Sequence, residues 1–431
     1  MQKSSVVRAL TVAALSVALI PAAQAADFDW TKYKGTTITF LANNNAVGNA
    51  VAKHKAEFEK LTGMTVKIDT YQEQQMRQRL VTVLNARSDE VDVFMTLVSR
   101  EGEQFAKAGW YADLGTLKAD SSPDYDFAGL SPALVKAATI NGKLTSIPAN
   151  VEGPVIYYRK DIFAKCGVAF PTALGALPDA AKAIKACDGG MTPFVSRGLR
   201  DAVAYTYSNV VHNMGGQYMK DGKSDLCSAP NKAALGLYAG LLKDYGPPGV
   251  VNYTFNQISS LYRTGRAAIA FESTNEFLAM MEGGAREGDT AIAVLPAGPG
   301  GSVPTGIGWG LSVSPFSTKQ GPAWYLVQWA TSPAMQAELA RDGIAAPRAK
   351  VAEDPEYKAF IAAKPIRQEW QRAVDAIART GSSEVGFPIV ANPASRSPIG
   401  QSVDEVLLAA KTVDQACADA DRSLDALIAG Q

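Results

Sequence analysis

The sequence is poor in the residues that most often carry catalysis and metal binding. Its 431 residues include only two histidines, His54 and His212, and four cysteines. No two cysteines have C-x-x-C spacing, and neither G-x-S-x-G nor H-E-x-x-H occurs. These absences argue against a zinc site, thioredoxin-like chemistry and the hydrolases that depend on those two motifs. We expect no metal, no cofactor and no catalytic residue.

Net charge and long hydrophobic runs are also lacking. The chain has 42 acidic and 42 basic residues, and this balance argues against binding of nucleic acid or an anionic membrane surface. After the N-terminal region, no stretch approaches the ~18 apolar residues that a membrane-spanning helix requires. A membrane-embedded protein is therefore not expected.

The N-terminal residues have the pattern of a secretory signal peptide. Lys3 and Arg8 precede an apolar run over 9–20, and Ala23-Gln24-Ala25 is a small-x-small cleavage pattern. The run is too short to span a bilayer, although a retained anchor is the alternative. The sequence predicts that residues 1–25 are removed and that the mature protein is periplasmic.

An even number of cysteines in an exported protein predicts disulfides, and four cysteines allow three pairings. Cys166 and Cys187 flank a proline-bearing loop and one short helix, so we prefer this pair. Cys227 and Cys417 would then tie a loop to the C-terminal helix. The other two pairings remain open.

After the signal peptide, short apolar strands alternate with amphipathic helices. This alternation predicts an α/β fold with a mostly parallel sheet. Strands are expected at 36–41, 66–68 and 91–95, and helices at 47–61, 72–85 and 102–107. Ligands of such sheets bind beyond the carboxyl ends of the strands, which draws attention to the turns at 43–45, 71–74 and 96–100.

The stretch Asn141–Phe163 has the pattern of a crossing between two domains. A polar, turn-prone segment at 150–153 separates an apolar run containing Pro148 from the strand-like run 155–158. Clefts between domains are preferred sites for small ligands, so we expect the ligand here.

Two further crossings are expected. One is the apolar strand 265–271, which returns toward the first domain, and the other is the glycine-rich segment 306–313. Three crossings predict two α/β lobes that form a hinged clamp. We expect the first lobe to comprise 26–148 plus 272–311, and the second lobe 149–271 plus 312–431.

Several segments together resemble a known family in order and spacing. They are FEKLTGMTVKI (58–68), DVFMTLVSREGEQFAKAGWYADL (92–114), GKLTSIPANVEGPVIYYRKDIFAKCGV (142–168), YRTGRAAIAFES (262–273) and WGLSVSPFSTKQGPAWYLVQWATSP (309–333). Nearly all of the mature chain resembles the extracellular solute-binding proteins of bacterial ABC importers, family 1, in the carbohydrate-binding group that includes maltose-binding protein.

The resemblance implies a two-lobed periplasmic binding protein of type II, with three hinge strands and a flytrap-like closure on a sugar. It also implies delivery to the importer's membrane permease. We expect a monomer that binds a small carbohydrate or polyol without converting it.

Carried over position by position, the resemblance places several residues at the sugar. Arg100 matches a hydroxyl-binding arginine, Glu152 an acidic position past the first crossing, and Tyr205 and Trp309 aromatic residues that stack on a ring. The chain departs from maltose-binding protein at Thr96 and Asn275, where that protein has tryptophans, so a small ligand fits better than a long maltodextrin. The full set of expected ligand-binding residues is Asn43, Asn44, Asn45, Gln74, Arg100, Asn150, Glu152, Tyr205, Glu272, Ser273, Asn275, Gly308 and Trp309.

Each of these assignments has a structural alternative. Arg100 could be a solvated surface charge, Glu152 a helix cap, and 43–45 an ordinary turn cluster. Tyr205 and Tyr207 point to different faces of one helix, so only one of them can reach the cleft.

Three arginines outside the expected set need separate treatment. Arg197 and Arg200 could select an acidic sugar or could lie in solvent. Arg348, which follows Ala346-Pro347, is expected to be structural. The sequence therefore leaves open whether the sugar is anionic.

Two other classes of function compete with a sugar-binding protein. A secreted glycoside hydrolase would need two carboxylates about 5 to 10 Å apart, and Glu152 and Glu272 form the only pair that can be nominated. A metal or peptide binder on the same fold is the other alternative, and the small number of histidines argues against the metal.

Overall fold

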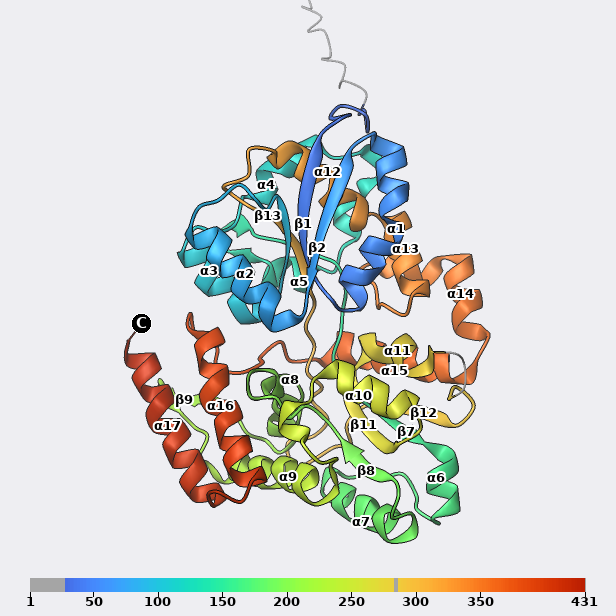
Figure 1. Ribbon diagram of the computed structural model, residues 1–431, viewed down its shortest axis with the longest axis vertical. Helices are drawn as coiled ribbons and strands as arrows, with labels where there is room; N and C mark the ends of the chain where they lie inside the picture. Colours follow the sequence, from blue (N-terminus) through green and yellow to red (C-terminus); the bar gives the residue numbers. More distant parts are fainter. Residues whose placement is uncertain (1–27, 283–285, 431) are drawn as a thin grey trace, which may run out of the picture.

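The computed structural model describes residues 28–282 and 286–430 and shows two α/β lobes arranged along the long axis of the molecule (Figure 1). The signal peptide predicted at 1–25 lies outside the described residues. Within the described ranges, no helix is long and apolar enough to cross a membrane. The predicted two-lobed α/β architecture is confirmed.

The first lobe is built on a five-stranded sheet in the order β2-β1-β3-β13-β6. Its strands are β1 (Thr37–Asn43), β2 (Thr65–Tyr71), β3 (Val93–Thr96), β6 (Ile147–Pro148) and β13 (Gly310–Val313). β1 runs parallel to β2 and β3, whereas β13 runs antiparallel to β3 and β6. All four residues of β3 are buried, as expected for a central strand covered by helices on both faces.

Helices cover this sheet, and β4 (Thr139–Ile140) and β5 (Lys143–Leu144) form a small hairpin beside it. The helices are α1 (Ala46–Thr62), α2 (Glu73–Asn85), α3 (Glu103–Lys107), α4 (Leu114–Leu117), α5 (Pro132–Ala137), α12 (Gln320–Ala330) and α13 (Pro333–Arg341). The predicted helix at 102–107 is preceded by a π-helical turn, η1 (Val98–Gly102). The alternation of strands and helices that the sequence predicts up to residue 107 is therefore confirmed.

The second lobe contains a four-stranded sheet in the order β12-β7-β11-β8. Its strands are β7 (Pro154–Arg159), β8 (Thr192–Val195), β11 (Ala267–Ser273) and β12 (Thr290–Ala293). β7 is antiparallel to β11 and β12, and β11 is parallel to β8. Every residue of β11 is buried, because this strand has a neighbour on each edge and helices over its faces.

The second lobe is rich in helices, and β9 (Met219–Lys220) and β10 (Lys223–Ser224) form a short hairpin in it. The helices are α6 (Lys160–Lys165), α7 (Leu177–Cys187), α8 (Arg200–Asn213), α9 (Ala229–Tyr245), α10 (Phe255–Arg263), α11 (Phe277–Met281), α15 (Pro365–Thr380), α16 (Asn392–Leu407) and α17 (Val413–Ala429). α16 packs against α8, α9 and α17, so the C-terminal part of the chain completes this lobe (Figure 1).

The return of the chain between lobes differs from the prediction. The sequence places 272–311 in the first lobe, but β12 pairs with β7 in the second sheet, and only β13 joins the first. It also places 312–431 in the second lobe, whereas α12 packs against α1 and β13 of the first. The error arises because β11, an apolar strand that was expected to leave the second lobe, is a central strand of its sheet.

Three segments nevertheless connect the lobes, and they lie side by side. The first is 149–153 and the second 306–309; Glu152 and Ile307 exchange two backbone hydrogen bonds of 2.8 Å. The backbone N–H of Val151 also donates to Ala345 O at 2.8 Å. The third connection runs through η9 (Ala349–Glu353) and α14 (Pro355–Ala362). The sequence had predicted the third crossing at 265–271 instead.

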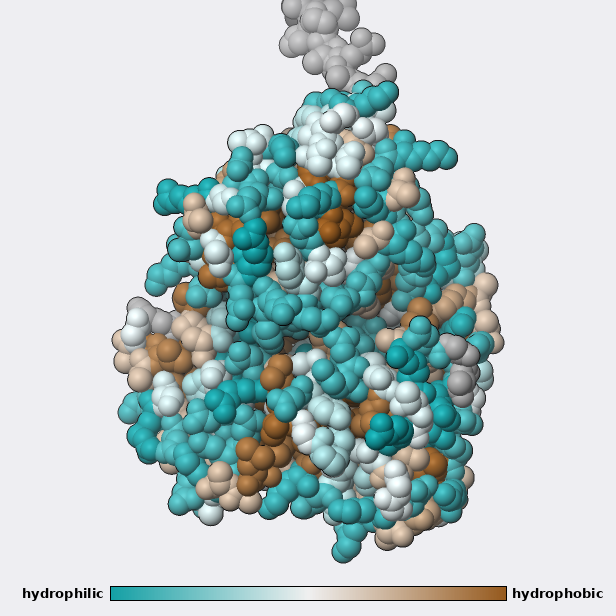
Figure 2. Space-filling view, viewed as in Figure 1, coloured by the Kyte–Doolittle hydropathy of each residue, from teal (hydrophilic) through white to brown (hydrophobic). Residues whose placement is uncertain are grey.

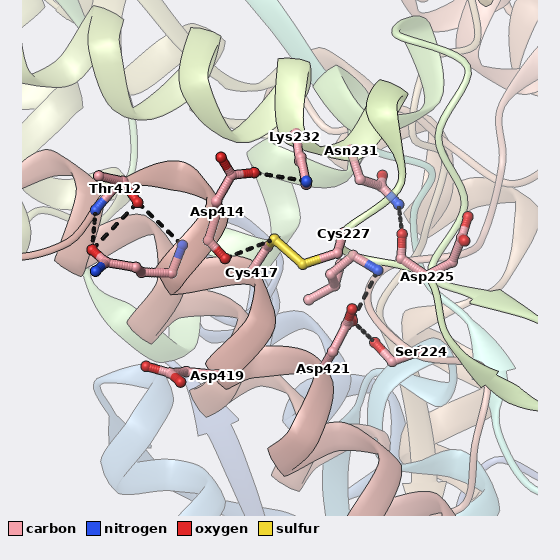
Figure 3. Close-up of a disulfide and its surroundings, with 12 residues drawn as sticks. Ser224, Asp225, Cys227, Asn231, Lys232, Thr412, Asp414, Cys417, Asp419 and Asp421 are labelled. Atoms are coloured by element: carbon pink, nitrogen blue, oxygen red, sulfur yellow. Dashed lines mark hydrogen bonds and ion pairs between the residues drawn. A yellow bond between two sulfur atoms is a disulfide. The ribbon is translucent and has the colours of Figure 1, made fainter.

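Both preferred disulfides are present. Cys166 is joined to Cys187 and Cys227 to Cys417, with Cα–Cα distances of 5.6 Å and 5.2 Å. Figure 3 shows Cys417 on α17 facing the loop that carries Cys227. In the next turn of α17, Asp421 accepts hydrogen bonds from Ser224 Oγ (2.5 Å) and Leu226 N (3.0 Å). The disulfide and this carboxylate together attach α17 to the lobe.

Replacing Cys227 and Cys417 with alanine should lower the free energy of unfolding by about 5 kcal/mol, because this bridge restricts the unfolded chain across a long loop. The two cysteines are 190 residues apart, whereas Cys166 and Cys187 are 21 apart. The alanine pair at Cys166 and Cys187 is the matched control and should cost about 3 kcal/mol. Urea unfolding measures both, and an equal or larger loss in the control would contradict the prediction.

Candidate functional site

A cavity lies between the two lobes, beside the connecting segments. The residues along the boundary between the lobes are mostly hydrophilic on the face shown in Figure 2. The lining residues come from the first lobe (Asn43, Asn45, Glu73, Leu97), the connecting segments (Glu152, Ile307, Trp309) and the second lobe (Arg197, Tyr205, Phe255, Ser273, Asn275, Glu276, Arg396).

The structure brings seven of the thirteen predicted ligand-binding residues into this lining: Asn43, Asn45, Glu152, Tyr205, Ser273, Asn275 and Trp309. The remaining six lie beside or behind it: Asn44, Gln74, Arg100, Asn150, Glu272 and Gly308. That the seven bind a ligand stays a prediction, whereas the geometry gives the other six different positions and partners.

The turn after β1 enters the cavity through Asn43. This residue is fully buried, and neither its Oδ1 nor its Nδ2 has a hydrogen-bond partner within the described ranges. Asn45 also lines the cavity, but its Oδ1 caps α1 by accepting from Gly48 N at 3.0 Å. Asn44 turns outward and its Oδ1 accepts from Asn49 Nδ2 at 3.1 Å. A buried amide without partners is costly, so Asn43 is the residue of this turn that is available to a ligand.

A compact charge cluster forms the first-lobe wall. Glu73 Oε1 accepts from Arg77 Nη2 (3.1 Å) and from Arg100 Nη1 (3.4 Å), and Arg77 also pairs with Glu101. Burial opposes the ionisation of Glu73, but Arg77 and Arg100 outweigh it and lower its pKa to about 2. Arg100 is buried, so it is not a solvated surface charge, and it does not line the cavity. Gln74, one residue further on, is half-buried outside the cavity.

A second buried ion pair supports the opposite wall. Arg197 Nε lies 2.9 Å from Glu272 Oε2, its Nη2 lies 2.5 Å from Oε1, and Ser273 N donates to Oε1 at 2.8 Å. The Arg197 guanidinium lies 4.3 Å from the centre of the Tyr205 ring. Glu272 thus holds Arg197 instead of facing a ligand. This arrangement argues against the hydrolase alternative, in which Glu272 was one of the two carboxylates.

The pKa values of two other carboxyl groups at the cavity, those of Glu152 and Glu276, are raised, whereas the pKa of Glu73 is lowered. Glu152 Oε2 accepts from Ser273 Oγ (2.7 Å) and Asn275 Nδ2 (2.8 Å), so Glu152 is not a helix cap. Burial raises its pKa to about 7. Burial also raises the pKa of Glu276 to about 7, although Ser259 Oγ donates to its Oε2 at 2.6 Å. Both groups can therefore gain or lose a proton near neutral pH.

Trp309 is positioned by the first connecting segment. Its backbone N–H donates to Asn150 Oδ1 at 2.7 Å, and the centre of its ring lies 5.1 Å from Arg77 Cζ. A Cβ atom on Gly308 would lie 2.2 Å from Asn150 O, so this glycine permits close approach of two backbone segments. Asn150 and Gly308 hold Trp309 in place without lining the cavity.

The structure also gives the positions of Tyr207, Arg200 and Arg348, for which the sequence analysis considered alternative roles. Tyr205 lines the cavity, whereas Tyr207 packs against Tyr238 in the core. Arg200 is half-exposed and pairs with Asp404 at 3.0 Å. Arg348 is buried and donates to the backbone oxygens of Thr331, Asp126 and Tyr125, which confirms its structural role.

Six lining residues were not predicted from the sequence: Glu73, Leu97, Phe255, Glu276, Ile307 and Arg396. The role of Arg197, which also lines the cavity, was left open. Three of the six directly neighbour predicted residues, so local reasoning found the right turns but the wrong positions. Arg396 lies on a helix far from any recognised segment. Among the described residues, no group of three or more His, Cys, Asp or Glu residues is placed to hold a metal ion.

The raised pKa of Glu152 gives a pH prediction. A folded-state pKa of about 7, against an ordinary value of 4.5, adds stability below pH 4.5 that is lost as the pH rises through 7. From pH 5 to 8 the ligand-free protein should lose roughly 2 to 3 kcal/mol of unfolding free energy relative to Glu152→Gln. Urea unfolding of both proteins at each pH measures the difference, in which other titrating groups cancel. A difference that does not change with pH would contradict the assignment.

Comparison with known proteins places the chain in a family. Residues 53–365 match the bacterial extracellular solute-binding proteins. The mannitol-binding protein of Pseudomonas aeruginosa is 26% identical over 405 residues, covering 88% of this chain and 90% of that protein.

Solved structures share the fold. A solute-binding protein of Agrobacterium radiobacter K84 in complex with ribitol has a TM-score of 0.81 and 22% identity, covering 91% of this chain and 99% of that one. A solute-binding protein of Agrobacterium vitis S4 with bound D-mannitol has a TM-score of 0.81 and 24% identity, covering 92% and 99%. With two lobes, three connecting segments and a match over most of its length, this chain belongs to the bacterial extracellular solute-binding proteins.

Proposed function

We propose that this protein captures one small polyhydroxylated molecule, a sugar, sugar alcohol or sugar derivative, in the cavity between its lobes. The observation that carries the proposal is the set of buried polar atoms around the cavity that have no partner in the described chain. They are Asn43 Oδ1 and Nδ2, Asn275 Oδ1 and Tyr205 Oη. An amide offers one donor and one acceptor side, which suits vicinal hydroxyl groups.

The similarity to a mannitol-binding protein and to structures with bound ribitol and D-mannitol favours a molecule of about six carbons or fewer. Thr96 is buried, and its Oγ1 is hydrogen-bonded to Tyr111 Oη at 2.7 Å. It therefore provides no aromatic surface on which a further sugar unit could stack. An open-chain sugar alcohol or a monosaccharide is therefore the size that we expect.

Closure of the lobes would enclose this ligand. At the rim of the cavity, Asn256 Nδ2 in the second lobe donates to Gln72 Oε1 in the first at 3.0 Å. We propose that a monomer, exported to the periplasm by a signal peptide at 1–25, delivers the ligand to the membrane subunits of an ABC importer without chemical change. The exposed Gln72–Asn256 bond is weak, so a ligand that contacts both lobes is needed to hold them together.

Calorimetric titration of the mature protein tests the proposal. Mannitol, ribitol, erythritol, glucose, maltose and the corresponding sugar acids form the panel, and at least one of them should bind with one-to-one stoichiometry. Ligand at 100 times its Kd should stabilise the fold by about 2.7 kcal/mol, which gives an independent thermal readout. If no member of the panel binds while an aryl glycoside is hydrolysed, the binding assignment is wrong and the enzyme alternative replaces it.

Trp309→Ala should weaken binding of that ligand by roughly 1 to 3 kcal/mol, or about 5- to 150-fold, because a stacked aromatic ring covers the C–H face of a sugar. Trp309→Phe is the matched control, since it keeps an aromatic face, and it should retain most of the affinity. Saturating ligand should also change the tryptophan emission of the wild type more than that of Trp309→Ala. Equal affinity and equal quenching in the two proteins would contradict the stacking role.

A further inference from the structure

Arg396 differs from the other guanidinium groups at the cavity because it has no ion pair with any described residue. Arg77 pairs with Glu73 and Glu101, Arg100 with Glu73, and Arg197 with Glu272. Arg396, on α16, is only 2% exposed and lines the cavity. Its contacts are two long ones of 3.5 Å, to Asn392 Oδ1 and to Val385 O.

A buried cation without a counter-ion is an unfavourable arrangement in a folded protein. Arginine does not escape this cost by losing its proton, because its guanidinium stays protonated in proteins. Burial, together with repulsion from Arg100 and Arg77, lowers the pKa of Arg396 and outweighs the attraction of Glu73 and Glu101, with which Arg396 forms no ion pair. The positive charge of Arg396 therefore lies at the cavity wall without an ion pair to any described residue.

The other charged residues at the cavity have partners of their own or can be neutral. Arg77, Arg100 and Arg197 are balanced by Glu73, Glu101 and Glu272, three cations against three anions. Glu152 and Glu276 remain, and burial raises the pKa of each to about 7. The net charge of these groups is therefore +1 when both carboxyl groups are protonated and −1 when both are ionised, and in either case Arg396 is the arginine of this set without an ion pair to a described residue.

We propose that the ligand is an acidic sugar derivative, a polyhydroxylated carboxylate such as an aldonic acid, whose carboxylate pairs with Arg396. The inference rests on the proposed function and narrows it from polyhydroxylated molecules in general to their monocarboxylic acids. The guanidinium nitrogens supply two parallel donors that match the two carboxylate oxygens. The hydroxyl groups are left for Asn43, Asn275 and Tyr205.

A single negative charge suits the cavity better than a phosphate. Arg77, Arg100 and Arg197 already have ion-pair partners, so the two negative charges of a phosphate would face the single unpaired guanidinium of Arg396. A carboxylate also has the planar shape that pairs with a guanidinium side by side. Phosphorylated sugars are therefore expected to bind more weakly than carboxylates of the same length.

The test compares ligands that differ only at one end. D-mannonate is titrated against D-mannitol and D-ribonate against D-ribitol, with D-mannose 6-phosphate as the dianionic arm. We expect each carboxylate to bind at least tenfold more tightly than its alcohol. Alcohols that bind as tightly as their acids, or the phosphate binding most tightly, would overturn the proposal while leaving the proposed function intact. Absence of binding by every alcohol, sugar and acid would overturn the proposed function itself.

Variants of Arg396 provide the second measurement. Arg396→Gln should weaken mannonate binding about 100-fold and change mannitol binding less than fivefold, and Arg396→Lys should retain part of the preference. Arg200→Gln removes a half-exposed arginine that is paired with Asp404 outside the cavity, and it should leave both affinities unchanged. An equal loss of affinity for acid and alcohol in Arg396→Gln would contradict the proposal.

The ligand-free protein gives a readout that does not depend on the choice of ligand. Because Arg396→Gln removes an uncompensated buried charge, its Tm should equal or exceed that of the wild type. A Tm lowered by several degrees would show that the fold itself compensates the charge, and Arg396 would then be a structural residue. Scanning calorimetry in ligand-free buffer distinguishes these outcomes.

Discussion

The structure depends on the ion pairs that compensate charged side chains buried between the two lobes. Burying a charge is tolerated only where partners compensate it, and this protein does so with two separate clusters. On the first-lobe wall, Glu73 and Glu101 bind Arg77, and Glu73 also binds Arg100; on the second-lobe wall, Glu272 binds Arg197. These pairs fix the shape of the cavity before any ligand enters. They also explain why so many charged residues can surround one small space.

The connecting segments contribute Glu152, Ile307 and Trp309 to the cavity lining. Glu152 and Ile307 form a short antiparallel pair, and Trp309 follows two residues after Ile307, with its backbone held by Asn150. Backbone hydrogen bonds hold these adjacent segments together at the boundary between the lobes.

The cavity combines two kinds of polar group that differ in what they can offer. Asn43 and Asn275 present amide atoms that have no partner among the described residues, and these suit hydroxyl groups. Arg396 presents a charge, which suits an anion. A neutral sugar alcohol would satisfy the first kind alone, and this difference is the physical basis for separating an alcohol from its acid.

The sequence by itself determined the elements that depend on local periodicity and on punctuation by glycine, proline and asparagine. The strands and helices up to residue 107, the polar turn at Asn43 and the first connecting segment follow from such patterns, and both disulfides are the preferred pairs. Family resemblance then located the cleft, because the quoted segments occur in the family's order.

Only the tertiary structure decided which residue of each turn enters the cavity and to which lobe the returning chain belongs. Glu73 lines the cavity where Gln74 was expected, because a shift of one position on an α-helix rotates a side chain by about 100 degrees. β12 lies in the second sheet because it forms backbone hydrogen bonds with β7, which a strand pattern does not specify. Arg396 is brought to the cavity by the packing of α16 on α8 and α9, which lie far from it in the sequence, and no local pattern encodes such contacts.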